Sequence, residues 1–280
     1  METKMEIRHP VHPDHFLMFD TEEVRDQFLI TDLFIPDRPK LVYSFFDRLI
    51  IGGICPLKPL SLDIDPEIIG ASYLLERREL GLINVGGDGR VKGAGVEFEI
   101  ANRDGLYLGM GVESIEFSSI DHTNPARFYM LSAPAHKRYE SVKISGADVE
   151  PVVLGEPLTS NHRTINKYIH PGGAQSCQLV MGMTVLEPGS VWNTMPTHTH
   201  QRRMEAYFYF GIEDNQCVFH LMGEPHETRH VVLRNHQAVI SPSWSIHSGV
   251  GTAAYSFIWG MAGENQDFDD MDHVAMETLG

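Results

Sequence analysis

The stretch MPTHTHQRRMEAYFYFG, residues 195–211, places two histidines one residue apart and a glutamate just before an apolar run that ends in glycine. In a β-strand successive side chains point to opposite faces, so His198 and His200 share one face and can converge on a single ion. Glu205 lies an odd number of residues from His200, so it reaches the same face only if the chain turns between them. Such a turn is expected in the polar residues QRRM that lie between them.

A further histidine completes a candidate metal site. His247 follows the letters SPSWSI, in which proline with flanking serines predicts a tight turn. Three imidazoles and one carboxylate suit a borderline divalent metal such as Zn, Mn, Fe, Ni or Co, and they leave positions open for substrate. Paired histidines also occur by chance in a chain with 15 of them. The combination of His198, His200, Glu205 and His247 with the glycine after the strand favours a metal site.

Strand-like segments surround this stretch in both directions. From about residue 40 onward, short runs rich in β-branched and aromatic residues alternate with glycine, proline and asparagine, as in KLVYSFF, ELGLINV, ARFYML, SCQLVMGMTVL and AYSFIWGM. Such spacing is typical of an antiparallel sandwich or barrel. The sequence therefore predicts an all-β protein.

One earlier segment is predicted to be helical. Asp20 and Glu23 have the spacing of a capping box, and Val24, Phe28 and Ile30 then supply an apolar stripe. We expect this short helix to serve packing or oligomer formation.

The two halves of the chain resemble each other. ERRELGLINVGG, from Glu76, and QRRMEAYFYFGI, from Gln201, share an arginine pair followed by a strand and glycine. Aligning the halves on this pair puts Tyr73 opposite His198 and Leu75 opposite His200. Further on, DGLYLGMGVES (104–114) lies opposite QAVISPSWSIH (237–247), so Ser114 faces His247. The first half therefore has the scaffold without the ligands.

These observations predict five regions. An N-terminal arm with a short helix covers 1–39, and a degenerate domain without a metal site covers 40–140. A polar, proline-bearing connector covers 141–165, the metal-binding domain covers 166–262, and a solvated acidic tail covers 263–280.

Composition restricts the partners and the compartment. With 22 basic and 38 acidic residues the net charge is −16, which opposes binding to nucleic acid or anionic lipid. Cys55, Cys177 and Cys217 are odd in number and far apart, which argues against a disulfide framework. The N-terminal letters METKMEIRHP lack the apolar core of a signal peptide, and no apolar run is long enough to span a membrane. We expect a reduced, cytoplasmic, soluble protein.

The motifs resemble those of the cupins. Proline and histidine at Pro242 and His247 resemble the second cupin motif, although Trp244 stands where that motif usually has glycine. The residues that resemble the first motif are Gly189, His198, His200, Glu205 and Gly211. With the degenerate first half, the resemblance implies a bicupin: two antiparallel β-sandwich or jelly-roll domains with short flanking helices and one metal site.

Longer segments resemble the 5-keto-4-deoxyuronate isomerase family over nearly the whole chain. They are YLLERRELGLINVGG (73–87), APAHKRY (133–139), TSNHRTINKY (159–168), WNTMPTHTHQRRMEAYFYF (192–210), ETRHVV (227–232), ISPSWSIHSGVGT (240–252) and FIWGMAGENQDFDDMDHVA (257–275). This resemblance implies a cytoplasmic homohexamer with one Zn²⁺ per subunit, held in the C-terminal cupin domain. It implies a ketol-isomerase of pectin breakdown whose substrate is a small anionic sugar, 5-dehydro-4-deoxy-D-glucuronate, and whose product is 3-deoxy-D-glycero-2,5-hexodiulosonate.

The substrate's carboxylate calls for a cation. Arg163 and Lys167 are the candidates for binding it, since a guanidinium matches a carboxylate bidentately. Arg202 and Arg203 are alternatives, but their counterparts in the first half indicate a structural role common to both copies. Trp192 and Trp244 are candidates for walls of the pocket, for a subunit contact or for ordinary core positions.

The sequence does not decide which group carries the proton or by which route the carbonyl moves. Glu205 is one candidate for the acid or base, and a metal-bound hydroxide is an equal one. Proton transfer through an enediolate and a hydride shift both move the carbonyl from C1 to C2.

Three other functions compete with the uronate isomerase. A 5-deoxyglucuronate isomerase has a related scaffold, and a cupin dioxygenase would use the same ligands for iron and oxygen. A non-catalytic sugar-binding cupin would retain carbohydrate affinity without turnover. Oxygen uptake with ferrous ion would distinguish the dioxygenase.

Overall fold

The computed structural model describes residues 4–280, so the first three residues of the predicted N-terminal arm lie outside it. The described chain divides into two compact units. The first contains the residues up to Arg8, Asp32–Glu150 and Lys167–Met181, and the second contains His9–Thr31, Pro151–Asn166 and Gly182–Gly280. Strands dominate both units, which confirms the all-β class.

The first unit has two sheets around its own core. The larger sheet has seven strands in the order β1 (Met5–Arg8), β3 (Lys40–Ser44), β4 (Ile50–Ile54), β11 (Phe128–Pro134), β6 (Arg78–Asn84), β9 (Gly105–Leu108) and β12 (Val142–Ile144). The smaller has four, in the order β5 (Leu60–Ser61), β10 (Glu116–Ser119), β7 (Gly89–Gly93) and β8 (Val96–Ile100). The pairing is antiparallel between these neighbours except at β1 and β3, which run parallel. Alternate residues of the strands, including Leu80, Val91 and Phe128, bury one apolar face in a common cluster.

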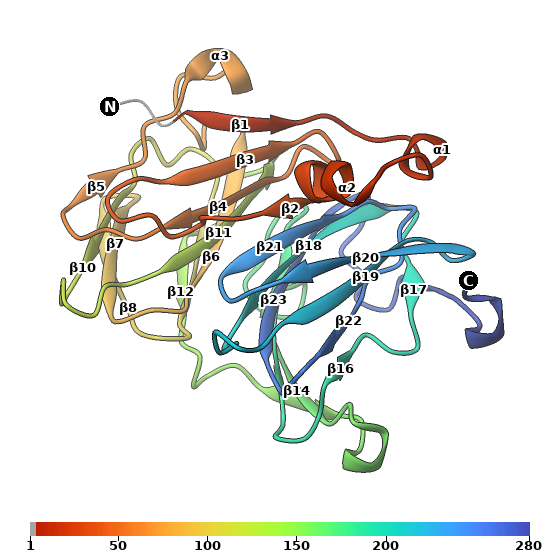
Figure 1. Ribbon diagram of the computed structural model, residues 1–280. Coiled ribbons are helices and arrows are strands. Elements are labelled where there is room, and N and C mark those ends of the chain that lie inside the picture. Colours follow the sequence, from red (N-terminus) through yellow and green to blue (C-terminus); the bar gives the residue numbers. More distant parts are fainter. Residues whose placement is uncertain (1–3) are drawn as a thin grey trace. The chain divides into compact units, whose positions relative to one another are not determined.

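The second unit repeats the arrangement and adds a short third sheet (Figure 1). Its larger sheet has the order β13 (Pro151–Leu154), β14 (Arg163–Ile169), β15 (Val180–Leu186), β23 (Ser256–Gly263), β18 (Arg203–Phe210), β21 (Gln237–Ser241) and β2 (Leu29–Ile30). The next has the order β16 (Trp192–Asn193), β22 (Ser248–Gly251), β19 (Val218–Glu224) and β20 (Glu227–Leu233). The third pairs β17 (His198–Thr199) with β24 (Asp272–His273).

Equivalent strands of the two units differ in one decisive residue. β6 pairs with β11 and β9, and β18 pairs in the same way with β23 and β21. Each strand begins with the second arginine of the repeated pair, Arg78 or Arg203. Two positions later β6 carries Leu80, which belongs to the apolar core, whereas β18 carries Glu205. The first unit therefore buries a leucine where the second presents a carboxylate.

The helices are short: α1 (Pro13–Phe16), α2 (Thr21–Phe28), α3 (Pro66–Ile69) and the 3-10 turns η1 (Pro157–Thr159) and η2 (Met276–Thr278). The capping box of α2 is confirmed, since Glu23 N donates to Asp20 Oδ1 at 2.9 Å and Asp20 N to Glu23 Oε2 at 2.8 Å. The extension of this helix to Ile30 is wrong. Leu29 is already extended and pairs with Val239, so the chain leaves α2 as the edge strand β2 beside β21 (Figure 1).

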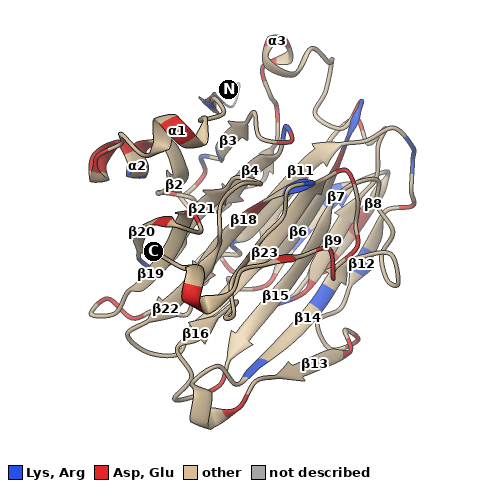
Figure 2. Cartoon of the chain, turned by 90° about the vertical axis from the view of Figure 1, so that its right-hand side faces the viewer, with Lys and Arg blue, Asp and Glu red and all other residues tan. Residues whose placement is uncertain are grey.

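Acidic side chains are prominent on the N-terminal helices. In Figure 2 the red of aspartate and glutamate covers much of α2, whereas lysines and arginines are scattered over several elements in that view. Within residues 4–280, no helix has the length and apolar character needed to cross a bilayer. The three cysteines are free thiols.

Candidate metal centre

The four predicted ligands arrive from three places in the second unit. His198 lies on β17, and the chain turns just after His200, where Arg203 N donates to His200 O at 3.3 Å. This turn lets Glu205 on β18 face the same side as the histidines. His247 stands immediately before β22, after a turn in which Ser245 N donates to Pro242 O at 3.0 Å.

Their polar atoms converge at one point. One ligand atom from each of His198, His200, Glu205 and His247 lies within 4.8 Å of all the others. The Nε2 atom of His198 lies 3.0 Å from that of His200 and 3.0 Å from that of His247. Glu205 Oε1 lies 2.8 Å from His200 Nε2. All four side chains are buried, with residue exposures of 7% or less.

The hydrogen bonds of His200 favour a cation bound among the four side chains over direct contacts between those side chains alone. His200 Nδ1 lies 2.6 Å from the carbonyl oxygen of Asp270, which can only accept, so Nδ1 carries the hydrogen. In the neutral ring Nε2 then presents a lone pair toward the carboxylate of Glu205 and toward His198, an arrangement that a shared cation stabilises. Ligand atoms about 2.1 Å from a tetrahedral zinc ion lie about 3.4 Å apart, close to the separations seen here. The four residues therefore could hold a divalent metal ion.

The protonation states support the same conclusion. Burial lowers the pKa of His198 to about 2 and that of His247 to about 4, so both imidazoles are neutral near pH 7 and keep lone pairs for a metal. Burial by itself raises the pKa of Glu205, but the imidazoles of His247 and His200 outweigh it and hold this pKa well below its usual range. His198 and His247 therefore offer neutral nitrogens beside the negative oxygens of Glu205.

A cavity of about 340 Å³ opens onto His198 and Glu205. Its walls are largely aromatic and apolar, and one guanidinium, that of Arg163, lies among them. Burial lowers the pKa of Arg163, the direction expected for a cation held partly out of water. The other lining residues are Leu154, Ile165, Thr184, Thr194, Met195, Pro196, Tyr207, Phe257, Trp259, Met261, Phe268, Asp269, Met271 and His273.

The candidate cations differ in where they lie. Arg163 lines the cavity, whereas Lys167, on the same strand β14, is not among its described lining residues. Arg203 is buried, and its Nη1 donates to the carbonyl of Asp267 at 2.5 Å. In the first unit Arg78 is buried in a similar way and donates to the carbonyl of Ser132 at 2.6 Å. The second arginine of each pair therefore has the structural role that the repeat indicates.

Sequence reasoning missed most of the cavity wall. Trp259 lines it, while Trp192 and Trp244 do not, and Trp244 instead packs on Phe16 with ring centroids 5.3 Å apart. Tyr207 could have been identified, because it lies two residues after Glu205 on the same strand and so shares its face. Trp259 could not, because it reaches the cavity through its pairing with Tyr207 across β18 and β23.

The acidic tail is not simply solvated, so that expectation is wrong for its first part. Asp272 and His273 form β24 against β17, directly beside His198. Arg202 forms ion pairs with Asp270 at 2.6 Å and with Asp272 at 2.9 Å. The first part of the tail therefore packs beside the candidate metal centre.

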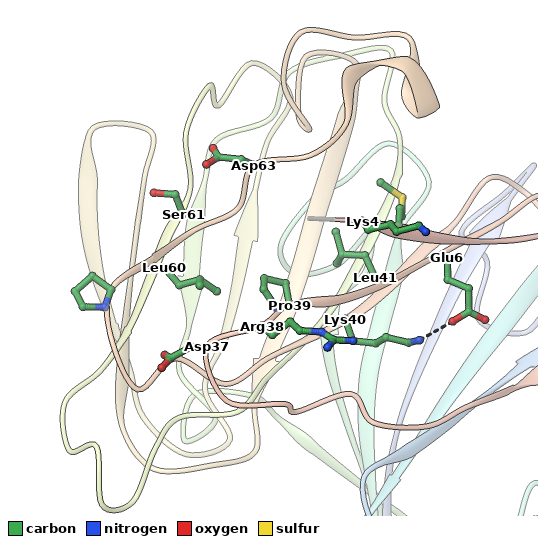
Figure 3. A pocket seen from close by; sticks show the side chains of 12 residues that line it. Lys4, Glu6, Asp37, Arg38, Pro39, Lys40, Leu41, Leu60, Ser61 and Asp63 are labelled. Carbon is green, nitrogen blue, oxygen red and sulfur yellow. Dashed lines mark hydrogen bonds and ion pairs between the residues drawn. The ribbon is translucent and has the colours of Figure 1, made fainter. Parts of the chain in front are cut away.

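A larger cavity, of about 730 Å³, lies in the first unit (Figure 3). Its charged side chains include Lys40, whose Nζ forms an ion pair with Glu6 at 2.5 Å (Figure 3). Lys4, Arg38, Asp37 and Asp63 also line it, so charges of both signs are mixed. It lacks the convergence of ligands that marks the cavity of the second unit, which we take as the functional site.

Known proteins resemble this chain in sequence and in fold. A profile described as the KduI/IolB family matches residues 34–276. The 4-deoxy-L-threo-5-hexosulose-uronate ketol-isomerases of Enterobacter sp. (strain 638) and Escherichia coli (strain SE11) are each 54% identical over 278 residues, which covers 98% of this chain and 100% of the relative.

Two solved structures have a similar fold at low identity. An IolB-like protein from Salmonella typhimurium LT2 has a TM-score of 0.65 at 14% identity, covering 81% of this chain and 87% of its own. Bacillus subtilis oxalate decarboxylase, a protein with Mn(II) centres, has a TM-score of 0.53 at 9% identity, covering 79% and 70%. These similarities support a cupin-like fold.

Proposed function

Because this chain belongs to the KduI/IolB family, as its profile match and its 54% identity to curated isomerases show, we propose that it is a metal-dependent ketol-isomerase of a deoxy-keto-uronate. The substrate is 5-dehydro-4-deoxy-D-glucuronate, also called 4-deoxy-L-threo-5-hexosulose uronate, and the product is 3-deoxy-D-glycero-2,5-hexodiulosonate. The proposal places the reaction in uronate breakdown.

One observation carries this proposal: three imidazole nitrogens and a carboxylate converge at a cavity that also holds a guanidinium. A sugar acid needs both features, since its carboxylate requires a cation and its reacting carbonyl requires an electrophile. The remaining walls of the cavity are largely aromatic and apolar.

We assign His198, His200, Glu205 and His247 as the metal ligands and Zn²⁺ as the ion, one per subunit. When bound, the ion supplies Lewis-acid polarisation of the carbonyl where negative charge develops. The remaining chemistry falls to the chain's own side chains.

Arg163 binds the substrate's carboxylate, since its guanidinium lines the cavity and can donate two parallel hydrogen bonds. Lys167 stays a sequence-based prediction for the same role. Glu205 has a second oxygen, Oε2, whose separation from His247 Nε2 is 3.8 Å, and we propose that this oxygen carries the proton.

The reaction balances without any co-reactant. Glu205 takes the proton from C2, the C2–H electron pair forms the C1–C2 double bond of an enediol, and the C1 carbonyl oxygen gains a proton to become a hydroxyl. Glu205 then returns its proton to C1, and the C2 hydroxyl loses a proton that balances the one gained at the C1 oxygen, which leaves the carbonyl at C2. No atoms are gained or lost, as an isomerase requires.

Assembly and organisation follow the family resemblance. We propose a cytoplasmic homohexamer and the division into a degenerate domain (40–140) and a metal-binding domain (166–262). Size-exclusion chromatography with light scattering tests the hexamer, and a monomer would remove that part of the proposal.

The function is tested by incubating the purified, zinc-loaded protein with the ketouronate derived from unsaturated galacturonate and following the C2 ketone by NMR. We expect turnover by the wild type, none by His200→Ala, and unchanged turnover by His230→Ala, which removes an exposed histidine of β20. Oxygen consumption with ferrous ion, without isomerisation, would instead identify a dioxygenase.

A 5-deoxyglucuronate isomerase is the second candidate, because the family profile includes IolB and the Salmonella IolB-like protein has a similar fold. This candidate ranks lower, because the Salmonella protein is 14% identical to this chain whereas the uronate isomerases are 54% identical. Both substrates should be assayed in parallel, and preference for 5-deoxyglucuronate would replace the first proposal.

A further inference from the structure

The chain after β23 runs back over the metal centre and is attached at both ends to the segment that carries two of the ligands. We call residues 264–275 the strap. At its start Glu264 N donates to Arg202 O at 2.9 Å, and at its end Val274 N donates to Thr197 O at 3.1 Å. Between these points β24 pairs with β17. The strap therefore brackets His198 and His200.

The middle of the strap touches a ligand directly. The carbonyl oxygen of Asp270 lies 2.6 Å from His200 Nδ1 and 3.2 Å from Arg203 Nη2. This carbonyl fixes the His200 tautomer that leaves Nε2 facing the other ligands. A displacement of Asp270 would release that constraint.

The strap also supplies one side of the substrate cavity. Phe268, Asp269, Met271 and His273 all line it. Phe268 packs on Trp259 with ring centroids 5.5 Å apart, so the strap meets the part of the wall that β23 provides through an aromatic contact. Without the strap the cavity would be open to solvent on this side.

Arg202 holds the strap from outside. Its Nε donates to Asp270 Oδ2 at 2.9 Å and its Nη2 pairs with Asp270 Oδ1 at 2.6 Å, a bidentate fork. Nη2 also donates to Asp272 Oδ2 at 2.9 Å. Asn265 Nδ2 donates to Asp270 Oδ2 at 2.6 Å from within the strap itself.

We propose that Arg202 is a positioning residue that, through Asp270 and Asp272, holds the strap against His200 and closes the substrate cavity. The substrate part of this inference rests on the proposed isomerase function. Arg202 is not among the described residues that line the cavity, and its described side-chain partners are Asp270 and Asp272, so it acts through the strap. Because exposed ion pairs add little to global stability, we expect its loss to loosen the strap rather than unfold the unit.

The test compares Arg202→Gln, which removes the charge, with Arg202→Lys, which keeps it but loses the fork. Asp270→Asn removes the carboxylate and leaves the backbone carbonyl that contacts His200. Arg90→Gln is the matched control, since it removes a similarly exposed arginine whose Nη2 pairs with Glu99 at 3.0 Å in the first unit. Three quantities are measured on the full chain: deuterium uptake of peptides from 264–275, the rate of zinc loss to EDTA, and kcat and KM.

For Arg202→Gln we expect faster deuterium uptake confined to the strap and roughly tenfold faster zinc loss, the size of effect typical of residues that orient metal ligands. KM should rise roughly tenfold with kcat within about twofold of wild type, and Arg202→Lys should recover part of each change. The double variant Arg202→Gln/Asp270→Asn should lose less than the sum of the two single losses, because both substitutions remove the contact between Arg202 and Asp270.

Wild-type zinc loss and deuterium uptake in Arg202→Gln would overturn the inference, as would equal effects in Arg90→Gln. Additive losses in the double variant would also overturn it. Deuterium uptake and zinc loss need no substrate, so a wild-type protein without isomerase activity would refute the proposed function while leaving the strap testable.

Discussion

His220 gives a prediction whose size follows from its burial. The side chain is 0% exposed, and Tyr209 Oη lies 2.8 Å from its Nδ1. Burial lowers the pKa of His220 from 6.5 to about 3. The folded protein therefore keeps this imidazole neutral at a pH where the unfolded chain protonates it.

The sign of the effect follows from this difference. As pH falls below 6.5, the unfolded state gains a proton that the folded state does not bind until pH approaches 3, so folding stability decreases. At about 1.4 kcal/mol per pH unit, His220 alone should cost about 2 kcal/mol between pH 7 and pH 5. Below the folded pKa the penalty stops growing.

The assay is urea unfolding of the EDTA-treated protein at pH 7, 6 and 5, for wild type and His220→Asn. Asparagine keeps a polar atom near the position of Nδ1, so Tyr209 retains a partner. The variant is expected to be less stable at pH 7 but to lose about 2 kcal/mol less than wild type on going to pH 5. His230→Asn should keep the wild-type slope. An unchanged slope in His220→Asn would refute the reasoning.

Three further changes have defined outcomes. Arg163→Gln removes the cation from the cavity. Because a charge-assisted hydrogen bond to the substrate is lost, KM for the uronate should rise roughly 10- to 100-fold. The zinc content, measured by atomic absorption, should stay at the wild-type level. Glu79→Ala removes the buried carboxylate that accepts from the backbone N–H groups of Cys177, Gln178 and Leu179 at 2.7–2.9 Å. It should lower the free energy of unfolding by about 3–5 kcal/mol, against little change for the exposed Glu97→Ala. Gly182→Ala would place a Cβ 2.2 Å from Trp259 Cζ2, so we expect about 1–3 kcal/mol of destabilisation by thermal unfolding and an altered KM as that wall of the cavity shifts.

The cluster that could hold a metal was accessible to sequence reasoning, and for His198, His200 and Glu205 the information is local. His198 and His200 have strand parity, and the polar letters between His200 and Glu205 permit the turn that the structure contains. The capping box of α2 was accessible for the same reason, since Asp20 and Glu23 contact each other directly.

The position of the strap could not be predicted from the sequence, because the residue that holds it is distant along the chain. The letters DFDDMD have the composition of a solvated acidic segment, and nothing in them specifies that Asp270 will meet Arg202, 68 residues away. The same limit applies to the tryptophans: Trp259 becomes a cavity wall only through the register of β18 with β23. The helical stripe was extended to Ile30, but two residues after Phe28 is the spacing of a strand, and its pairing with Ala238 makes Ile30 a strand residue.

The most direct test of the metal-dependent isomerase is a titration of ketouronate turnover against added zinc. The protein is first stripped with a chelator and shown to be folded, and zinc is then returned in measured amounts. The proposal predicts no turnover without metal, a linear rise that saturates at about one zinc per chain, and no rise in His247→Ala. Full turnover by the metal-free protein would contradict it.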